Sequence, residues 1–265
     1  MPSLAVIGHP VAHSRSPDMH TAALAELGLA GEWNYGAIDI APENFEVEVA
    51  ELAAAGDYAG VNVTIPHKEA ALAIADEASE GARAIGAANT LTFKDGRILA
   101  DNTDAGGVIR SLPHIPVGER ALVLGAGGAA RAAIWALADV GAKVDVWNRT
   151  PERAATVAAE LGGHAVTDPL AADYQLIVNT TSVGLHGEDP FEHLPVDAAD
   201  FRPGQVVFDL VYGPESGALL VAAEAAGATT IEGLEMLVQQ GALSLRIWTG
   251  AEPSLEAMRT GARRS

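Results

Sequence analysis

A glycine-rich turn near the middle of the chain constrains the possible fold more than any other feature of the sequence. The stretch LVLGAGGAAR places Gly125, Gly127 and Ala130 in a G-x-G-x-x-A arrangement, after an apolar run and before an alanine-rich one. In such a unit the first glycine permits a tight turn, the second lets the backbone approach a pyrophosphate, and the small third residue lets the helix pack closely. The stretch therefore indicates a nucleotide-binding strand–turn–helix unit, although packing alone can also produce a glycine-rich turn.

Apolar runs of strand length alternate with alanine-rich runs along the chain. LAVIG precedes PDMHTAALAEL, YAGVNVTI precedes KEAALAIADEA, RALVLG precedes GAARAAIWALADV, and KVDVW precedes PERAATVAAEL. This alternation is typical of parallel sheets built from βαβ units, so we expect an α/β fold. Because the glycine turn lies near the midpoint, the residues in front of it must form a second domain. We expect a helix over 104–113 to cross between the domains, and the helices after Gly233 to cross back.

Two local patterns predict where elements begin or reverse. Ser16 followed by Pro17 supplies an N-cap and a first-turn proline, which predicts the start of a helix. Asp95 and Gly96 separate TLTF from RILA, which predicts a tight hairpin between two strands.

The strand after the glycine turn indicates which cofactor binds. NAD sites usually place an acidic residue at the tip of this strand, where it binds the ribose hydroxyls. Here KVDVW ends in Asn148, Arg149 and Thr150, and Asp145 lies within the strand instead. A guanidinium can bind a 2′-phosphate through paired hydrogen bonds, whereas a carboxylate would repel it. The tip therefore favours NADP.

The helix that follows this tip extends the same interpretation. Thr150 can cap a helix that begins at Pro151, and Arg153 lies one turn further along. The alternative is a solvated helix start at which the arginines pair with Glu152 or Glu160.

The N-terminal stretch GHPVAHSRSPDMH predicts a site for an anion. Ser14 and Ser16 are two residues apart, so both hydroxyls can face one side of an extended loop and hold a carboxylate beside a helix start. His9, His13 and His20 raise the alternative of a metal site. No carboxylate accompanies them at ligand spacing, so we expect no metal.

A second cluster of polar residues predicts a site that binds hydroxyl groups. Asn62 and Thr64 lie on one side of a predicted strand, and Lys68 follows where a helix begins. The positive end of a helix dipole disfavours a protonated lysine, which suits a group that exchanges protons. Further polar side chains follow at the ends of the next predicted elements, where binding sites are often found: Asn89, Asn102, Thr103 and Asp104.

The composition limits the partners that the chain can have. The formal net charge of −19 argues against nucleic acid, and any anion must be held by a local group of basic side chains and backbone donors. The most apolar stretch is interrupted by Arg131 and Asp139, which argues against a membrane span. The sequence contains no cysteine and begins with no secretory signal. We therefore expect a cytoplasmic protein, a monomer or a homodimer, that binds small molecules.

The residues quoted above resemble those of the shikimate dehydrogenase family. The resemblance covers nearly the whole chain and consists of separate blocks in the family's order. The blocks are GHPVAHSRSPDMH, NVTIPHK, GAANT, NTD, GAGGAAR, NRTPER, NTTSVG, DLVYGP and EGLEMLVQQGA.

The resemblance implies a two-domain architecture. A mostly parallel α/β substrate domain would comprise residues 1–104 and 235–265, and a Rossmann domain that binds NADP would comprise residues 105–234. One departure is that Glu235 stands where the family often has glycine, which puts an additional side chain near the expected nicotinamide pocket.

The resemblance also implies roles for individual residues by matching position. Lys68 and Asp104 correspond to the catalytic pair, and Ser14 and Ser16 to the pair that holds the substrate carboxylate. The implied ligands of the substrate's hydroxyl groups, or residues that close over it, are Thr64, Asn89, Tyr212 and Gln240, and we add Asn62 from the strand pattern. The implied cofactor-binding residues are Gly125, Ala126, Gly127, Gly128 and Ala129 at the pyrophosphate, Asn148, Arg149, Thr150 and Arg153 at the adenosine phosphate, and Thr180, Ser182, Leu210 and Gly233 at the nicotinamide.

The implied reaction is the reversible reduction of 3-dehydroshikimate to shikimate by NADPH. Two alternatives remain open: a quinate/shikimate dehydrogenase that prefers NAD, and a catalytically silent regulator that binds NADP or a ring acid. Arg149 and Arg153 argue against the first, and the presence of Lys68 and Asp104 argues against the second. A folate-linked dehydrogenase of similar domain order lacks support because its motifs do not match these blocks.

Overall fold

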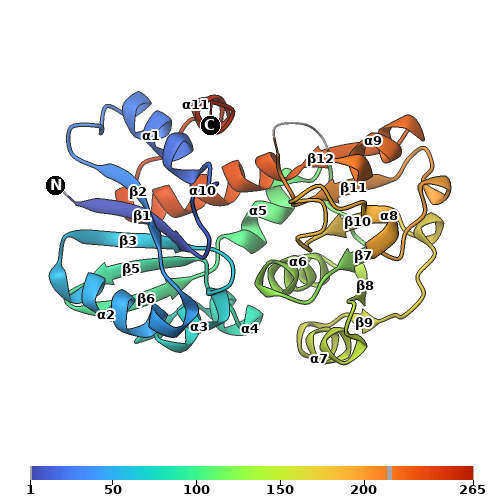
Figure 1. Ribbon diagram of the computed structural model, residues 1–265, viewed down its shortest axis with the longest axis horizontal. Helices are drawn as coiled ribbons and strands as arrows, with labels where there is room; N and C mark the ends of the chain where they lie inside the picture. Colours follow the sequence, from blue (N-terminus) through green and yellow to red (C-terminus); the bar gives the residue numbers. More distant parts are fainter. Residues whose placement is uncertain (1, 214–216, 265) are drawn as a thin grey trace. The chain divides into compact units, whose positions relative to one another are not determined.

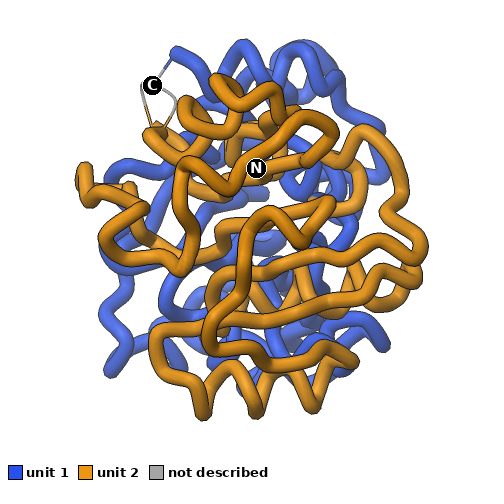
Figure 2. Tube along the Cα trace, turned by 90° about the vertical axis from the view of Figure 1, so that its right-hand side faces the viewer, with its two compact units in different colours: residues 1–107, 237–265 blue, residues 108–236 orange. Residues whose placement is uncertain are grey.

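The computed structural model describes residues 2–213 and 217–264, and the chain divides into two compact units (Figure 2). One unit, unit 1, comprises residues 1–107 and 237–265, and the other, unit 2, comprises residues 108–236. Helices α5 (Asp104–Ser111) and α10 (Gly233–Thr249) each contribute residues to both units.

Unit 1 contains a six-stranded sheet with the order β2-β1-β3-β5-β6-β4 (Figure 1). Strand β1 pairs in parallel with β2 and β3, and β4 pairs in parallel with β6, whereas β5 is antiparallel to both of its neighbours. The expectation of a mostly parallel sheet is therefore confirmed. The strands are β1 (Ser3–Gly8), β2 (Asn34–Asp39), β3 (Tyr58–Val63), β4 (Glu77–Ala78), β5 (Thr90–Lys94) and β6 (Arg97–Asp101).

The predicted hairpin between β5 and β6 is also confirmed. Asp95 and Gly96 both have positive φ angles, 54° and 72°. A two-residue loop of this kind matches the natural twist of the two strands, and aspartate and glycine are the residues that tolerate it best.

Helices cover both faces of the sheet in unit 1. Figure 1 shows α1 and α11 on one side and α2 and α3 on the other. Phe45 and Val49 of α2 pack with Val61 and Leu91 in the hydrophobic core beneath that helix. The helices confined to this unit are α1 (Ser16–Glu26), α2 (Phe45–Ala55), α3 (Lys68–Ala73), α4 (Glu80–Ile85) and α11 (Leu255–Ala262), and a short 3₁₀ turn covers Pro42–Asn44.

The helix expected over KEAALAIADEA is shorter than the pattern predicted. It ends at Ala73, and Glu77 and Ala78 pair with β6 as strand β4. The carboxylate of Asp76 accepts a hydrogen bond of 2.7 Å from the backbone N–H of Ile98. Pairing with the free edge of the sheet, a tertiary interaction, has overridden the helical propensity of these residues.

Unit 2 contains a second six-stranded sheet, in which all strands are parallel and the order is β12-β11-β10-β7-β8-β9. This arrangement is the doubly wound Rossmann order, with the change of direction beside β7. The strands are β7 (Arg120–Leu124), β8 (Lys143–Trp147), β9 (His164–Ala165), β10 (Leu176–Asn179), β11 (Val206–Asp209) and β12 (Thr229–Glu232). The helices are α6 (Gly128–Asp139), α7 (Pro151–Leu161), α8 (Pro190–His193) and α9 (Ala218–Ala225), with 3₁₀ turns at Ala171–Asp173 and Ala198–Asp200.

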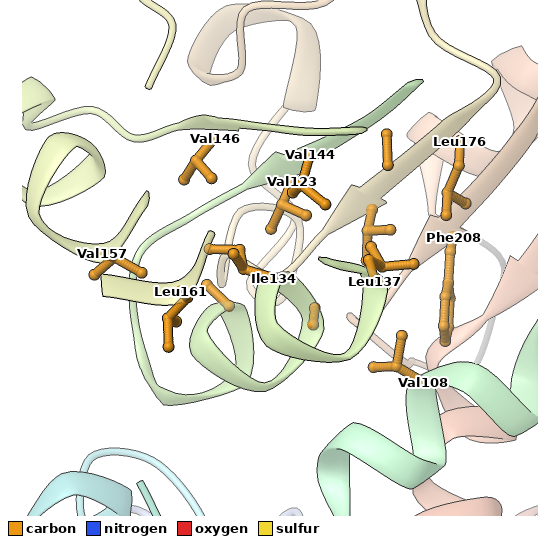
Figure 3. Packing of buried hydrophobic residues seen from close by; sticks show 14 of the residues in the cluster. Val108, Val123, Ile134, Leu137, Val144, Val146, Val157, Leu161, Leu176 and Phe208 are labelled. Carbon is orange, nitrogen blue, oxygen red and sulfur yellow. The ribbon is translucent and has the colours of Figure 1, made fainter. Parts of the chain in front are cut away.

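Both faces of this second sheet are buried. Val123 of β7 faces a core formed with α6 and α7 (Figure 3), and Ala121 belongs to the same core. Leu122 and Leu124 face the opposite core, which includes Leu219 of α9. Because consecutive strand residues point to opposite faces, a strand that is covered on both sides reads as a continuous apolar run. This explains the uninterrupted ALVL that precedes the glycine turn.

Within residues 2–213 and 217–264, no helix combines the length and the apolar character that crossing a membrane requires.

Candidate functional site

A compact group of polar side chains in unit 1 is built around Lys68 and Asp104. The Lys68 Nζ lies 2.5 Å from Asp104 Oδ2, and the two side chains are only 12% and 3% exposed. Both are the first residues of helices, α3 and α5. A helix N-terminus favours the carboxylate and disfavours the ammonium, so the carboxylate offsets the unfavourable position of the lysine.

Asn89 connects this ion pair to its surroundings. Its amide nitrogen lies 2.8 Å from Asp104 Oδ1, 3.0 Å from Thr103 Oγ1 and 3.1 Å from Gln240 Oε1. Its amide oxygen accepts a hydrogen bond of 2.7 Å from the Thr103 backbone N–H. The structure thus brings together four residues expected at the site, Lys68, Asn89, Asp104 and Gln240, from three helices and the loop before β5.

Asn62 lies deeper in the same unit. Its oxygen accepts hydrogen bonds from the Tyr35 and Ser244 hydroxyls, at 2.7 and 3.3 Å, and its nitrogen donates to Asn89 O and Thr90 Oγ1. An amide side chain offers two donors and two acceptors, so protein groups use all four. Asn62 therefore holds the backbone of Asn89 and the side chain of Thr90 in place. Its position in the strand pattern did not predict these contacts. Thr64 follows the end of β3 and is partly exposed.

Ser14 and Ser16 lie at the start of α1, but the N-cap of the helix is not Ser16 as expected. Ser16 is the first residue of the helix rather than its N-cap, which is Arg15. The Ser14 Oγ accepts a hydrogen bond of 3.3 Å from the Ser16 backbone N–H. The helix therefore begins one residue earlier than the pattern predicted, and Pro17 still lies in its first turn, where proline is tolerated.

The three N-terminal histidines do not form a cluster. His9 Nδ1 lies 2.6 Å from Asp39 Oδ1 on the surface, His13 is exposed, and His20 is fully buried. Among the described residues, no group of three or more histidine, cysteine or acidic side chains is arranged to hold a metal ion.

The glycine turn in unit 2 has the geometry that its sequence predicts. Gly125 has a φ of 120°, and a Cβ at this position would lie 2.5 Å from Thr180 Oγ1. A Cβ at Gly127 would meet nothing within 4 Å, and no side chain caps the start of α6. Ala130 is fully buried against the sheet. The turn thus presents uncapped backbone N–H groups beside open space, as a pyrophosphate requires.

Side chains that could hold a 2′-phosphate follow β8. Arg149 and Arg153 are exposed, as the alternative of a solvated helix start also expects. Within the described parts of the chain, however, neither forms the ion pair with Glu152 or Glu160 that this alternative included. Glu160 pairs with Arg131 instead, at 2.8 Å.

The carboxylate and the threonine at this strand have structural roles. Asp145 lies 2.9 Å from both Arg120 and the Tyr174 hydroxyl, which keeps it away from the tip. Thr150 occupies the N-cap of α7 as expected, but its hydroxyl makes no capping bond, and its carbonyl oxygen accepts a hydrogen bond from the Asn148 side chain. The predicted capping by the Thr150 side chain is therefore wrong.

The residues expected at the nicotinamide lie at the carboxyl ends of β10 and β11 and at the start of α10. Thr180 donates a hydrogen bond of 2.7 Å to the Leu124 carbonyl oxygen, and Ser182 is exposed. A Cβ at Gly233 would collide with the carbonyl oxygen of Leu210, which explains the glycine. Tyr212 and Glu235 are partly buried. The proline of the DLVYGP block, at position 214, lies outside the described residues.

Two further residues at this edge were missed by the sequence interpretation. Asn179 and Asp209 are buried at the ends of β10 and β11, and the Asn179 amide donates a hydrogen bond of 2.9 Å to Asp209 Oδ1. Burial raises the pKa of Asp209 to about 6, against the opposing effect of hydrogen bonds from Val211 and Asn179. The available signal was a polar residue that closes each apolar run, QLIVN and VVFD.

Comparison with known proteins covers both units. Family models match at residues 6–91 (shikimate dehydrogenase substrate binding domain), 114–183 (shikimate / quinate 5-dehydrogenase) and 233–260 (shikimate 5′-dehydrogenase C-terminal domain). The shikimate dehydrogenase (NADP(+)) of Acidiphilium cryptum is 45% identical over 258 residues, which are 95% of this chain and 91% of the relative.

Solved structures agree with this assignment. A crystal structure of the Thermus thermophilus shikimate 5-dehydrogenase, in complex with NADP(H) and shikimate, is 46% identical with a TM-score of 0.91 and covers 100% of this chain and 99% of its own. A 5-ketofructose reductase of Gluconobacter is 32% identical with a TM-score of 0.88, over 99% of this chain and 98% of its own. The chain belongs to the shikimate dehydrogenase family.

Proposed function

We propose that this protein catalyses the reversible reduction of 3-dehydroshikimate to shikimate with NADPH. The observation that carries the proposal is the buried Lys68–Asp104 ion pair, with Asn89 and Gln240 hydrogen-bonded around it. An ammonium, a carboxylate and amide groups in one place suit a substrate that presents a ketone beside several hydroxyl groups. We assign unit 1 to substrate binding and unit 2 to NADP binding.

Each group in unit 1 has a chemical task in this proposal. Lys68 donates its proton to the carbonyl oxygen, where negative charge grows during reduction. Asp104 holds the ammonium in position and accepts hydrogen bonds from substrate hydroxyls. Thr64, Asn89 and Gln240 bind the remaining hydroxyls, and Ser14 and Ser16 hold the carboxylate.

The cofactor supplies the hydride when it is bound. The open glycine turn, Gly125 to Ala129, holds the pyrophosphate, and the tip of β8, Asn148 to Thr150 together with Arg153, holds the 2′-phosphate. Thr180, Ser182, Leu210 and Gly233 position the nicotinamide. Addition of a hydride to the carbonyl carbon and of the Lys68 proton to the carbonyl oxygen would convert the ketone to an alcohol.

A substrate and cofactor panel tests this proposal directly. Oxidation of NADPH and of NADH is measured with 3-dehydroshikimate, 3-dehydroquinate and 5-ketofructose as ketones. We expect turnover with NADPH and 3-dehydroshikimate to exceed every other combination. Preference for NADH with activity on both ring acids would identify the quinate/shikimate alternative, and binding without turnover would identify a silent regulator.

We also propose that the protein acts in the cytoplasm, because a chain without cysteine suits a reducing compartment. We propose that it acts there as a monomer or a homodimer.

Replacement of the proposed acid gives a sharper test. Lys68→Met keeps the length of the side chain but removes its proton, so kcat should fall by about 10²–10⁴-fold with little change in KM. Lys94→Met, which alters an exposed lysine of the same unit, is the control and should retain wild-type kinetics. Near-normal turnover of Lys68→Met would remove this lysine from the chemistry.

A further inference from the structure

Two neighbouring strands of unit 2 end in a hydrogen-bonded pair of polar side chains. Asn179 and Asp209 are opposite each other in the parallel register of β10 and β11. The Asn179 Nδ2 donates to Asp209 Oδ1 at 2.9 Å. The pair therefore joins the two strands at the point where each gives way to a loop.

Each member of the pair also binds the loop that follows it. The Asn179 Oδ1 accepts hydrogen bonds from the Thr181 backbone N–H and hydroxyl, at 3.1 and 2.8 Å. The Asp209 Oδ1 accepts a hydrogen bond of 3.1 Å from the Val211 backbone N–H. The two loops are thus fixed at their first residues, and fixed relative to each other.

The same network reaches the glycine turn. Thr180, between Asn179 and Thr181, donates its hydroxyl to the Leu124 carbonyl oxygen at 2.7 Å. A Cβ at Gly125 would lie only 2.5 Å from this Oγ1, and a Cβ at Gly233 would collide with the Leu210 carbonyl oxygen. A continuous set of contacts therefore links the pyrophosphate turn, both loops and the start of α10.

Burial of this pair needs an explanation. Asn179 is 0% exposed and Asp209 is 4% exposed, and both end strands that are otherwise apolar. Burying polar groups costs free energy unless hydrogen bonds compensate for it, and an apolar pair would serve packing equally well. The hydrogen bonds to the loops are what an apolar pair could not supply.

We propose that Asn179 and Asp209 are positioning residues that hold the loops bearing Thr180, Ser182 and Leu210 in the arrangement that receives the nicotinamide end of the cofactor. The inference rests on the proposed function, because it takes those residues to be the nicotinamide site. Asn179 and Asp209 have no part in binding the adenosine end of the cofactor in this proposal, because the site proposed for that end is at the tip of a different strand, β8.

The test compares a whole cofactor with a fragment of it. The dissociation constants of NADPH and of adenosine 2′,5′-bisphosphate, which lacks the nicotinamide, are measured by calorimetry on the chain with both units present. Asp209→Ala and Asn179→Ala should weaken NADPH binding about tenfold or more, which corresponds to the loss of about one well-made buried hydrogen bond, and leave the bisphosphate within about twofold. Asp209→Asn keeps the oxygen that accepts from Asn179 and Val211, so it should restore most of the affinity for NADPH.

Thr181→Ala provides a milder variant in case the alanine variants fold poorly. It removes only the hydroxyl that binds Asn179, and it should weaken NADPH about threefold without affecting the bisphosphate. Thr156→Ala removes a threonine hydroxyl from the exposed surface of α7 in the same unit and is the matched control. It should leave both affinities unchanged.

The outcomes separate this inference from the function on which it rests. Equal weakening of both ligands would show that the pair only maintains the fold, and unchanged NADPH affinity in every variant would show that the pair has no role; either result overturns the inference alone. Failure of the wild-type chain to bind the bisphosphate would overturn the assignment of NADP, and the inference with it.

Discussion

His20 is a titratable residue in a fully buried position. It is fully buried, and within residues 2–213 and 217–264 it is the residue whose buried side-chain nitrogens lack a hydrogen-bond partner. Its ring stacks on Tyr35 with centroids 4.1 Å apart. Burial lowers the pKa of His20 from 6.5 to about 3. Between these two pKa values, His20 is therefore protonated in the unfolded chain and neutral in the folded one.

This shift gives a prediction about acid stability. Below a pH of about 6.5 the unfolded state binds a proton that the native state excludes, so stability should fall by about 1.4 kcal/mol for each pH unit until the pH nears the native pKa. His20→Phe retains the stacked ring and removes this dependence. Thermal unfolding followed from neutral to mildly acidic pH should show a shallower slope for the variant. His13→Gln, at an exposed histidine, should keep the wild-type slope; equal slopes in all three proteins would refute the assignment.

Arg149 is the residue to which we assign, as a proposal, binding of the 2′-phosphate of NADP. It is exposed after β8 and free of ion pairs within the described parts of the chain, so its guanidinium is available to a phosphate.

Arg149→Ala should weaken NADPH binding by about 2 kcal/mol, roughly 30-fold, because a charge-assisted hydrogen-bonding group is lost. NADH lacks the 2′-phosphate, so its affinity should change little. Arg264→Ala, at an exposed arginine of unit 1, is the control for the loss of one positive charge. Parallel losses for NADPH and NADH would contradict the phosphate assignment.

At the scale of elements, α11 packs against α1 through a glycine. A Cβ on Gly261 would lie 2.5 Å from the Asp18 carbonyl oxygen, 2.8 Å from Ala22 Cβ and 3.0 Å from Met19 Cα. Two of these atoms belong to the α1 backbone, which cannot move aside like a flexible side chain. The absence of a side chain thus lets the last helix contact the first one.

Gly261→Ala should therefore destabilise unit 1 by about 1–3 kcal/mol, the usual cost of overpacking a tight contact. Gly31→Ala is a matched control, because a Cβ there meets nothing within 4 Å. Both can be compared by thermal unfolding. Equal midpoints for the two variants would mean that the helices separate without cost.

At the scale of the whole molecule, the chain forms two units, each with a six-stranded sheet of its own. Helices α5 and α10 contribute to both, so the chain passes between the units twice in helical form. Each unit has its own hydrophobic cores, which allows a ligand of one unit to stabilise it selectively.

Binding of the cofactor fragment should reveal this independence. Adenosine 2′,5′-bisphosphate at about 100 times its dissociation constant should stabilise the state that binds it by about 2.7 kcal/mol. Hydrogen exchange should therefore slow within residues 108–236 and remain unchanged within residues 1–107. Equal protection of both ranges would show that they unfold as one.

The sequence alone determined the features that depend on local pattern. Period and length of the apolar runs predicted the α/β class, Asp95-Gly96 predicted the hairpin, and G-x-G-x-x-A predicted the turn before α6, because each depends on backbone preferences of neighbouring residues. The blocks that carry the family resemblance are likewise readable in order, and the comparisons confirm that family.

Tertiary structure decided what depends on residues far apart in the chain. Glu77 and Ala78 lie in a helical sequence pattern but pair with the edge of β6 as a strand. The side-chain oxygen of Asn62 accepts hydrogen bonds from the Tyr35 and Ser244 hydroxyls. The Asn179–Asp209 pair joins strands that are separated by thirty positions in the sequence. A single position shows its own residue type and spacing, but its hydrogen-bond partners and its burial exist only once the sheets have formed, because distant strands become neighbours only in the folded chain.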